Sequence, residues 1–455
     1  MYIKVFFRLV LFCGAMLASG WVWAAPQIQT WQTANGAKVL FVEAPEIEMV
    51  DVRLVFDAGS ARDGGKQGVT SFTNSLLSEG AGEWSAYQIA ERMEGVGAQL
   101  DTGSLRDMAW VSVRTLTEPK ALATTLETLA AVVAKPNFAE EDIERQRQSI
   151  LAGLVQDEQS PGSLGKKRLY QLVFGDHPYA GDPAGNMESV KAITREDLVA
   201  THNRLYVANN ALVAIVGAVG RAQAEAIADQ VTAGLRPGQQ APKLPPVKPL
   251  QAAIDEKIPF PSTQAHLYIG QPGMRRGDPD YFPLYVGNHI LGGSGLVSLL
   301  SHEVREKRGL SYSVYSFFLP MRQTGLFQLG LQTKNDQAGE ALQVAKNTLE
   351  RFIREGPTAE ELKAAKQNIT GGFPLRIASN GNIVEYLAVI GFYDLPLDYL
   401  DSFNSKVEAV TREQIKDAFK RRIDPDRLVR VQVGRNMPLA QVSTESDADS
   451  GDGDR

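Results

Sequence analysis

The stretch Val190-Lys-Ala-Ile-Thr-Arg-Glu-Asp-Leu198 returns 217 residues later as Val407-Glu-Ala-Val-Thr-Arg-Glu-Gln-Ile415. Each copy is followed by an apolar segment that ends in Val-Gly, at Leu212–Gly217 and at Leu428–Gly434. A constant offset over several features indicates an internal duplication, so we predict two copies of one domain of roughly 200 residues. Two earlier features recur in the same order. Val52–Asp63 resembles His266–Asp278, and Pro136 with Ala139–Glu141 resembles Pro357 with Ala359–Glu361.

A proline-rich segment separates the two copies. Residues Arg236–Pro261 carry seven prolines. This density favours an extended, semi-rigid linker and disfavours a helix. We therefore expect a first domain over residues 25–235, a linker over 236–261 and a second domain over 262–440. Residues 441–455 are rich in acids and are predicted to form a disordered tail. We also expect each half to bury its own core, with the linker as an accessible strap.

Strand and helix patterns are interleaved within each copy. Residues 52–58, 109–116 and 325–333 have the pattern of strands. Leu122–Val133 and Leu342–Phe352 place apolar residues on one helical face, and each precedes a proline. The order lacks regular βαβ units and therefore predicts an α+β fold for both copies.

The first 24 residues have the features of a secretory signal peptide. Lys4 and Arg8 precede the mostly apolar Leu9–Leu17, and Val22-Trp23-Ala24 is a small-x-small cleavage pattern. The apolar run is short for a membrane span, so an uncleaved anchor is the less favoured alternative. No later stretch is apolar enough to span a membrane. We expect export to the bacterial periplasm, with secretion from the cell as the alternative.

The composition is that of an ordinary globular protein. Hydrophobic residues make up 44% and charged residues 22% of the chain, which excludes a wholly disordered or multi-span membrane protein. The formal net charge is −6, so no basic field attracts nucleic acid. The one cysteine, Cys13, lies in the signal segment, so the mature chain would have no disulfide.

Few residues are suited to metal or phosphate chemistry. No two of the five histidines lie three or four residues apart, so no helical pair can bind zinc. His302-Glu303-Val-Arg-Glu306 imitates His-Glu-x-x-His but ends in glutamate, which favours a charged helix face. Gly292–Gly295 lacks the Lys-Ser/Thr of a phosphate-binding loop and is interpreted as a helix start or a tightly packed glycine cluster. The histidines are His177, His202, His266, His289 and His302.

One segment carries a stronger signal. Leu291–Tyr315 joins Gly-Gly-Ser-Gly to Arg305-Glu-Lys-Arg-Gly-Leu-Ser-Tyr312. It resembles the C-terminal half of M16 (insulinase/pitrilysin) metallopeptidases, whose pattern there is Arg-Glu-x-x-Gly-Leu-x-Tyr. The duplicated domain, the linker and the signal peptide extend this resemblance over essentially the whole mature chain. It implies two homologous M16-type (LuxS/metallopeptidase-like) α+β domains, arranged as a clamshell around a chamber that encloses peptides.

The chain departs from the family at its catalytic signature. The two histidines of the family's His-x-x-Glu-His motif fall on Ser71 and Ser75, and its glutamate falls on Asn74. The distal glutamate ligand is expected near Ile150–Leu154, which contains no glutamate. Serine hydroxyls bind zinc poorly, and an amide cannot take a proton from metal-bound water. We therefore expect no metal and no cofactor on this chain. The corresponding place in the second copy has Asn288-His289.

The resemblance implies a role in trans. In heterodimeric M16 pairs, one chain carries zinc, while the other closes the chamber and supplies the Arg/Tyr pair. We therefore expect a zinc-bearing M16 partner, a peptide substrate, and Arg305 and Tyr312 acting on the substrate carbonyl in the transition state. One alternative is a purely structural or peptide-binding scaffold, and another is an independent hydrolase with ligands of another kind.

Spacing alone favours a structural role for the same pair. Gly309 is expected to end a helix that contains Arg305. Arg305 would then pair with a helix acid such as Glu303, and Tyr312 would be a half-buried aromatic at the start of a strand over Ser311–Phe318. The position of these two side chains therefore separates the two interpretations.

Overall fold

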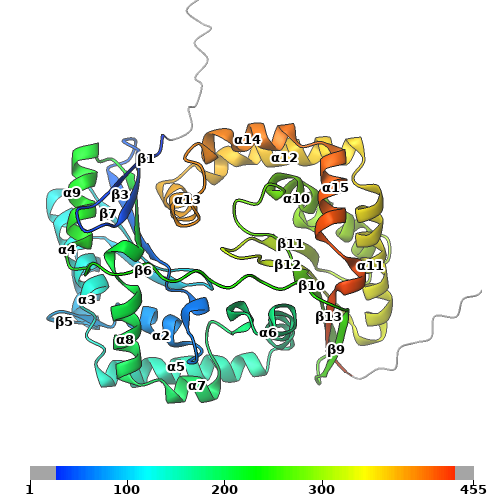
Figure 1. Ribbon diagram of the computed structural model, residues 1–455, viewed down its shortest axis with the longest axis horizontal. Coiled ribbons are helices and arrows are strands. Elements are labelled where there is room, and N and C mark those ends of the chain that lie inside the picture. The colour runs from blue at the N-terminus through cyan, green and yellow to red at the C-terminus, as the bar shows by residue number, and fades with distance from the viewer. Residues whose placement is uncertain (1–26, 436–455) are drawn as a thin grey trace, which may run out of the picture.

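The computed structural model describes residues 27–435 and contains two similar α+β halves (Figure 1). The expected signal peptide and the expected tail over 441–455 lie outside the described residues. The strands of the first sheet are β1 (Gln29–Gln32), β2 (Lys38–Glu43), β3 (Met49–Phe56), β6 (Gln99–Ser104), β7 (Ala109–Leu116) and β8 (Ala211–Gly217). Those of the second sheet are β9 (Ile254–Pro259), β10 (Gln264–Pro272), β11 (Val314–Leu319), β12 (Leu326–Lys334) and β13 (Val429–Gly434). A short hairpin is made by β4 (Gly80–Ala81) and β5 (Trp84–Ser85).

Helices surround both sheets. The helices of the first half are α2 (Val69–Ser75), α3 (Ala86–Glu94), α4 (Pro119–Ala134), α5 (Glu140–Glu158), α6 (Pro161–Phe174), α7 (Met187–Ala192), α8 (Arg195–Leu205) and α9 (Arg221–Thr232). Those of the second half are α10 (Tyr281–Asn288), α11 (Ala338–Glu355), α12 (Ala359–Arg376), α13 (Asn380–Phe392), α14 (Tyr399–Ala409) and α15 (Arg412–Arg422).

The two sheets repeat one topology, which confirms the duplication. The first sheet has the order β1-β2-β8-β3-β7-β6, and the second has the order β9-β13-β10-β12-β11. In each sheet one parallel pair, β2 with β8 or β9 with β13, adjoins an otherwise antiparallel set. The predicted α+β class and the two copies of one domain are therefore present.

The repeated nine-residue stretch forms the same local structure in both copies. Thr194 and Thr411 are the N-caps of α8 and α15. Each threonine side chain accepts a hydrogen bond from the backbone three residues on, and the side chain of that residue accepts one in return. This capping box satisfies amide groups that the first turn of a helix leaves unpaired. The sequence repeat therefore marks two equivalent helix starts.

The linker differs in part from its prediction. Residues 236–253 form neither helix nor strand, as predicted, but Ile254–Pro259 form β9, which pairs in parallel with β13. The second domain therefore begins at Ile254 and not at residue 262. The remaining linker is held down at several points: Arg62 Nη1 donates to the carbonyl of Pro242 at 2.5 Å, and Leu244 is buried.

The halves are joined by two helices, because each half packs one of its helices on the sheet of the other half. Helix α6 of the first half packs on β10 and β13, and α13 of the second half packs on β8, β3 and β2 (Figure 1). Two glycines allow the close approach: a Cβ at Gly165 would lie 2.4 Å from the Tyr268 ring, and one at Gly391 would lie 2.6 Å from Leu212. One apolar cluster accordingly contains residues of both halves, including Leu40, Leu212 and Leu387. The expectation of separate cores is wrong in part: one apolar cluster lies wholly within the first half, but the cluster of the second half includes residues of the first sheet, because α13 covers that sheet.

A buried carboxylate adds a polar connection between the halves. Asp107, 3% exposed, follows β6 in the first half. It accepts hydrogen bonds from the Tyr179 hydroxyl at 2.6 Å, the Tyr393 hydroxyl at 3.0 Å and the Arg322 backbone amide at 2.7 Å. Burial raises the pKa of both tyrosines, and the neighbouring carboxylate adds to this effect, so both remain neutral donors.

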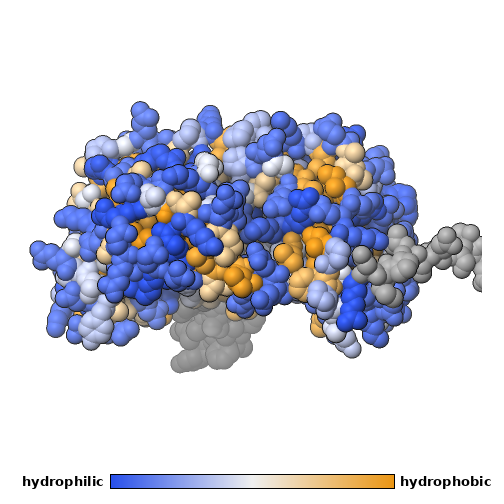
Figure 2. Space-filling view, turned by 90° about the horizontal axis from the view of Figure 1, so that it is seen from below, coloured by the Kyte–Doolittle hydropathy of each residue, from blue (hydrophilic) through white to orange (hydrophobic). Residues whose placement is uncertain are grey.

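The outer surface on the side of α5 and α7 is mainly hydrophilic, with apolar residues in small separate groups (Figure 2). Within residues 27–435, no helix combines the length and the apolar composition needed to cross a membrane.

Limited proteolysis should cut the described chain first within residues 236–253, because exposed segments outside helices and strands are cleaved soonest. The two fragments should then elute together in native size-exclusion chromatography, because α6 and α13 hold each half on the sheet of the other. Denaturing gels report the cut, and the native elution volume reports the association. Fragments that separate without denaturant would contradict the shared core.

Replacement of Asp107 should weaken the whole molecule. The Asp107→Asn change places an amide NH₂ against three hydrogen-bond donors, so at least one buried group loses its acceptor. We expect the free energy of unfolding in urea to fall by about 2–4 kcal/mol. The matched control is Asp398→Asn at an exposed helix start, for which we expect a change within about 0.5 kcal/mol.

Candidate functional site

Arg305 lies at the end of a short helical segment. Residues Ser301–Glu306 form a π-helical turn, and the Gly309 amide donates to the Arg305 carbonyl at 2.8 Å. Gly309 has a φ of +61°, a conformation that glycine adopts without strain. The predicted end of the helix at Gly309 is confirmed, and it turns the chain toward Tyr312.

Tyr312 is presented to solvent by a small turn. The Ser311 hydroxyl donates to the Ser313 carbonyl at 2.8 Å, and the Ser313 amide donates back to the Ser311 hydroxyl at 3.2 Å. The side chain of Tyr312, between these serines, is 87% exposed. Strand β11 begins at Val314, so the strand predicted from Ser311 starts three residues too early. Tyr312 is therefore an exposed turn residue and not a half-buried strand aromatic.

The structure brings Arg305 and Tyr312 to one open hollow. They line it together with Leu296, Glu306 and Gly309, and its volume is about 340 Å³. The two side chains come from opposite sides of the Gly309 turn. A phenol and a guanidinium facing one space form a set of hydrogen-bond donors suited to an oxygen with developing negative charge.

Glu303 is engaged with other cations and leaves Arg305 available. Its carboxylate lies 3.0 Å from Lys307 Nζ, 2.9 Å from Arg308 Nη1 and 3.2 Å from Arg351 Nη2. Burial raises the pKa of this carboxyl group, but hydrogen bonds from these cations outweigh it and lower the pKa of Glu303 to about 2. In the part of the chain that the structure describes, Arg305 has no ion pair. The expected pairing of Arg305 with Glu303 is therefore wrong.

The segment that imitates His-Glu-x-x-His makes local contacts. His302 Nδ1 lies 2.9 Å from Glu306 Oε2, and both side chains are exposed. This agrees with a charged helix face.

Asn74 has a structural role at the position of the family's catalytic glutamate. Its side chain on α2 is 2% exposed. Its Nδ2 donates to the Gly103 carbonyl of β6 at 2.9 Å, and its Oδ1 accepts from the Tyr206 hydroxyl at 3.0 Å. Burial raises the pKa of Tyr206, so this phenol remains a neutral donor. The amide thus joins α2 to the edge strand of the first sheet and to the end of α8.

The second half uses the same device. Asn288 lies 214 residues after Asn74, at the end of α10. Its Nδ2 donates to the Ser316 carbonyl of β11 at 3.0 Å, and the Ser316 hydroxyl donates to its Oδ1 at 2.8 Å. Each asparagine therefore ties a helix to the edge strand of its own sheet. The sequence contains a signal for this role, because an asparagine recurs at the repeat offset in both copies.

The remaining positions of the family's metal site are equally unsuited to zinc. The Ser75 hydroxyl donates to the Phe72 carbonyl at 2.9 Å, inside α2. At the distal position, Leu151 and Leu154 of α5 are buried in an apolar cluster. Arg147, one turn earlier, lies with its Cζ 5.5 Å from the Phe72 ring and brings positive charge toward α2. Over residues 27–435, no three His, Cys, Asp or Glu side chains are grouped as metal ligands. These residues do not fit zinc.

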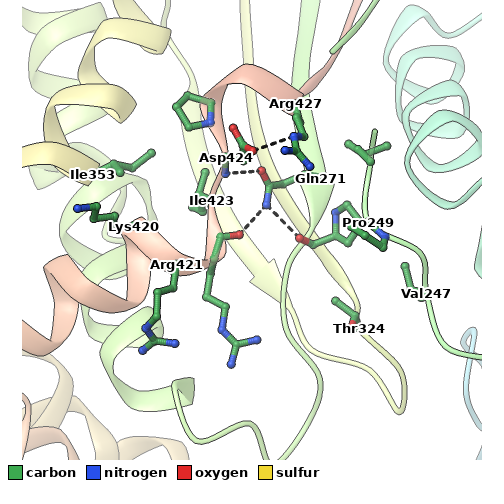
Figure 3. Close-up of a pocket in the computed structure, with 14 residues that line it drawn as sticks. Val247, Pro249, Gln271, Thr324, Ile353, Lys420, Arg421, Ile423, Asp424 and Arg427 are labelled. Carbon is green, nitrogen blue, oxygen red and sulfur yellow. Dashed lines mark hydrogen bonds and ion pairs between the residues drawn. The ribbon is translucent and has the colours of Figure 1, made fainter. Parts of the chain in front are cut away.

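A larger hollow of about 500 Å³ lies between the linker and α15 (Figure 3). Gln271 closes its inner side, because its Nε2 donates to the Arg422 carbonyl at 2.7 Å and its Oε1 accepts from the Asp424 amide at 3.0 Å. Arg421 and Arg422 are already paired with Asp280, and these hydrogen bonds lower the pKa of Asp280 to about 2. Two of the cations that line the hollow are therefore already neutralised by Asp280.

The fold and the replaced motif define a two-domain, M16-type protein without the catalytic signature. Two family models match the chain: Insulinase (Peptidase family M16) over residues 38–182, and Peptidase M16 inactive domain over residues 192–369. A crystal structure described as the peptidase M16 inactive domain from Pseudomonas fluorescens is 40% identical in sequence to this chain, with a TM-score of 0.88. The match covers 90% of this chain and 98% of the chain in that structure. The chain belongs to the M16 family, among members that lack the catalytic motif.

Other relatives carry names of two kinds. The non-peptidase homolog YmxG of Helicobacter pylori is 27% identical over 400 residues, which are 86% of this chain and 90% of the relative. The uncharacterized zinc protease SCO5738 of Streptomyces coelicolor is 27% identical over 327 residues, 70% of each chain.

The purified chain should contain no stoichiometric zinc and should cleave no peptide alone, because neither Asn74 nor the α5 positions offer ligands. Metal analysis by mass spectrometry and a peptide-cleavage assay measure this. The triple change Ser71→His, Asn74→Glu and Ser75→His should still fail to bind zinc tightly, since the distal ligand is absent as well. About one tightly held zinc per unmodified chain would contradict the prediction.

Proposed function

We propose that this chain is the non-catalytic subunit of an exported, heterodimeric M16 zinc peptidase. It closes the peptide chamber and supplies Arg305 and Tyr312 to the active site of a zinc-bearing partner. One observation carries the proposal: Tyr312 is 87% exposed and lines the same open hollow as Arg305. Such a pair is placed to act on a group outside this chain.

The chemistry of the pair suits peptide hydrolysis. Attack on a peptide bond places negative charge on the carbonyl oxygen, and a phenol can donate a hydrogen bond to that oxygen. A guanidinium can bind a neighbouring peptide carbonyl or orient the phenol. Zinc in the partner would activate the attacking water. Tyr312 and Arg305 need no metal on their own chain for these tasks.

Apolar residues beside the hollow support contact with a second chain. Leu296, which lines the hollow, is 60% exposed, and the adjacent Val297 is 84% exposed. Exposed large apolar side chains that gather at one place are typical of interaction surfaces. Their position next to Arg305 and Tyr312 is where a partner's active site would approach.

The relatives support the two parts of the proposal separately. The Helicobacter pylori protein is named a non-peptidase homolog, which supports the non-catalytic assignment. The Streptomyces coelicolor protein is named a zinc protease, which supports peptide hydrolysis as the chemistry of the complex. The signal-peptide pattern of residues 1–24 supports a place in the periplasm or outside the cell.

The scaffold alternative makes a different prediction. A purely structural or peptide-binding chain would need Asn74, Asp107 and the exchanged helices, but it would not need Tyr312 or Arg305. The partner can be sought by co-purification from the native cell, as an exported chain of similar length with His-x-x-Glu-His.

In the reconstituted complex, Tyr312→Phe should lower kcat by roughly a hundredfold or more, because removal of one transition-state donor costs about 2.7–4 kcal/mol. Arg305→Ala should act similarly and should also raise KM. Folding and partner binding should be unchanged, since neither side chain is part of the core. Kinetics with a fluorogenic peptide measure the effect.

The matched controls are Tyr87→Phe and Arg354→Ala. Tyr87 is 75% exposed on α3, and the Arg354 side chain is 68% exposed and pairs with the adjacent Glu355. Full activity of a complex with both the Tyr312 and Arg305 changes would identify the chain as a scaffold.

A further inference from the structure

A second concave site lies in the second half, between α10, α12, α13 and α14. These helices lie together in Figure 1, with α13 near the middle of the molecule. The hollow has a volume of about 430 Å³ and shares no lining residue with the Arg305–Tyr312 hollow. Its wall combines aromatic rings with two guanidinium groups: Tyr281, Tyr285, Tyr386, Tyr399, Phe403, Arg276 and Arg376.

The aromatic wall is fixed by its own packing. The rings of Tyr281 and Tyr285 are stacked, with centroids 5.8 Å apart and an interplanar angle of 6°. Phe403 meets Tyr285 edge-on at 5.9 Å and is itself stacked on Phe373 at 4.3 Å. Rings held in this way offer a preformed surface to an aromatic or large apolar group, because little side-chain freedom remains to be lost on binding.

The two arginines give this wall a positive charge. Arg376 is exposed and lines the hollow, and its Nη1 donates to the Tyr285 hydroxyl at 2.7 Å. The Nε of Arg276 is buried and donates to no acceptor in the part of the chain that the structure describes. Within residues 27–435 neither arginine forms an ion pair, and Glu385, which also lines the hollow, lies 3.4 Å from Arg53 of the first half. The hollow therefore attracts an anion.

A neighbouring hollow connects this site to the first sheet. It has a volume of about 320 Å³, shares Asn382 and Glu385 of α13 with the aromatic hollow, and is also lined by Gln99 and Asp101 of β6. β6 is an edge strand; Asn74 occupies its Gly103 carbonyl, so an added strand would pair with the part that begins at Gln99. In a segment that pairs antiparallel with β6, the C-terminal end lies beside Gln99, because Gln99 is the first residue of β6. That end points toward the aromatic hollow.

We propose that the aromatic hollow binds the C-terminal residue of a peptide, with the carboxylate at Arg276 and Arg376 and an aromatic or large apolar side chain against the tyrosines. The assignment to a peptide rests on the proposed function, because that function brings peptides into the chamber. A free aromatic carboxylic acid has the same chemistry, and the experiment separates the two sources.

The test is equilibrium binding to the purified full chain without partner. The probes are pentapeptides labelled with fluorescein at the N-terminus, which end in phenylalanine as the free acid, in phenylalanine amide, or in alanine as the free acid. We expect the phenylalanine acid to bind at least tenfold more tightly than either of the others, since a charged hydrogen-bonded pair and a buried ring each contribute about this factor. N-acetylphenylalanine should compete at least tenfold more weakly than the unlabelled peptide acid.

Variants locate the binding site. Arg376→Gln should weaken binding of the phenylalanine acid roughly tenfold and leave the amide unchanged, and Arg276→Gln should act in the same direction. Arg354→Gln is the matched control and should bind like the unmodified chain, with thermal melting used to verify that each variant is folded.

Equal binding of acid and amide would overturn the proposal, as would an unaltered affinity in Arg376→Gln. Equal competition by N-acetylphenylalanine would overturn the assignment to a peptide. None of these outcomes depends on zinc or on Tyr312, so they are distinct from failure of the proposed function, which the kinetics of the Tyr312 variant report.

Discussion

The exchange of α6 and α13 is the constraint on which the rest of the structure depends. A β-sheet that exposes an apolar face is unstable in water, and here each half covers the sheet of the other half with one helix. Gly165 and Gly391 make the approach possible, because a side chain at either position would collide with the opposite half. The hydrogen bonds of Asp107 then fix the halves at a second place. The two halves consequently share part of their packing and are also joined by hydrogen bonds.

Features that depend on neighbouring residues, or on a repeat along the chain, could be predicted from the sequence. The duplication, the α+β class and the helix end at Gly309 followed from a repeat offset, from residue periodicity and from a single glycine. The exchanged helices could not be predicted in this way, since an apolar pattern shows that a face is buried but not which segment covers it. For the same reason β9 was assigned to the linker: its residues are half-buried and alternate with exposed ones, but its partner, β13, lies far along the chain. Tyr312 was named from its motif, and only the turn of Ser311 and Ser313 shows its exposure.

The position of Asn74 shows why loss of the zinc motif is more than a loss of ligands. An amide can donate and accept at the same time, and Asn74 does both, to Gly103 and from Tyr206. An ionised glutamate at this position could accept from Tyr206 but could not donate to Gly103, and it would carry a charge into a site that is 2% exposed. Asn288 makes the equivalent bonds in the second half, where the family has no metal site. The first half thus has the helix-to-sheet connection of a structural domain.

The two halves share a core plan but differ in the groups that they present to their surroundings. The second half carries the exposed Tyr312 with Arg305, which has no ion pair within residues 27–435, and the tyrosine-lined hollow with Arg276 and Arg376. An exposed phenol contributes little to folding because water satisfies it, whereas the buried Nε of Arg276 has no acceptor among the described residues. In the first half, Arg62, which lies at the place of Arg276 in the repeat, is paired with Asp57 at 2.6 Å. The hydrogen-bond donors on which the proposed function depends therefore lie in the second half, although both halves share one core plan.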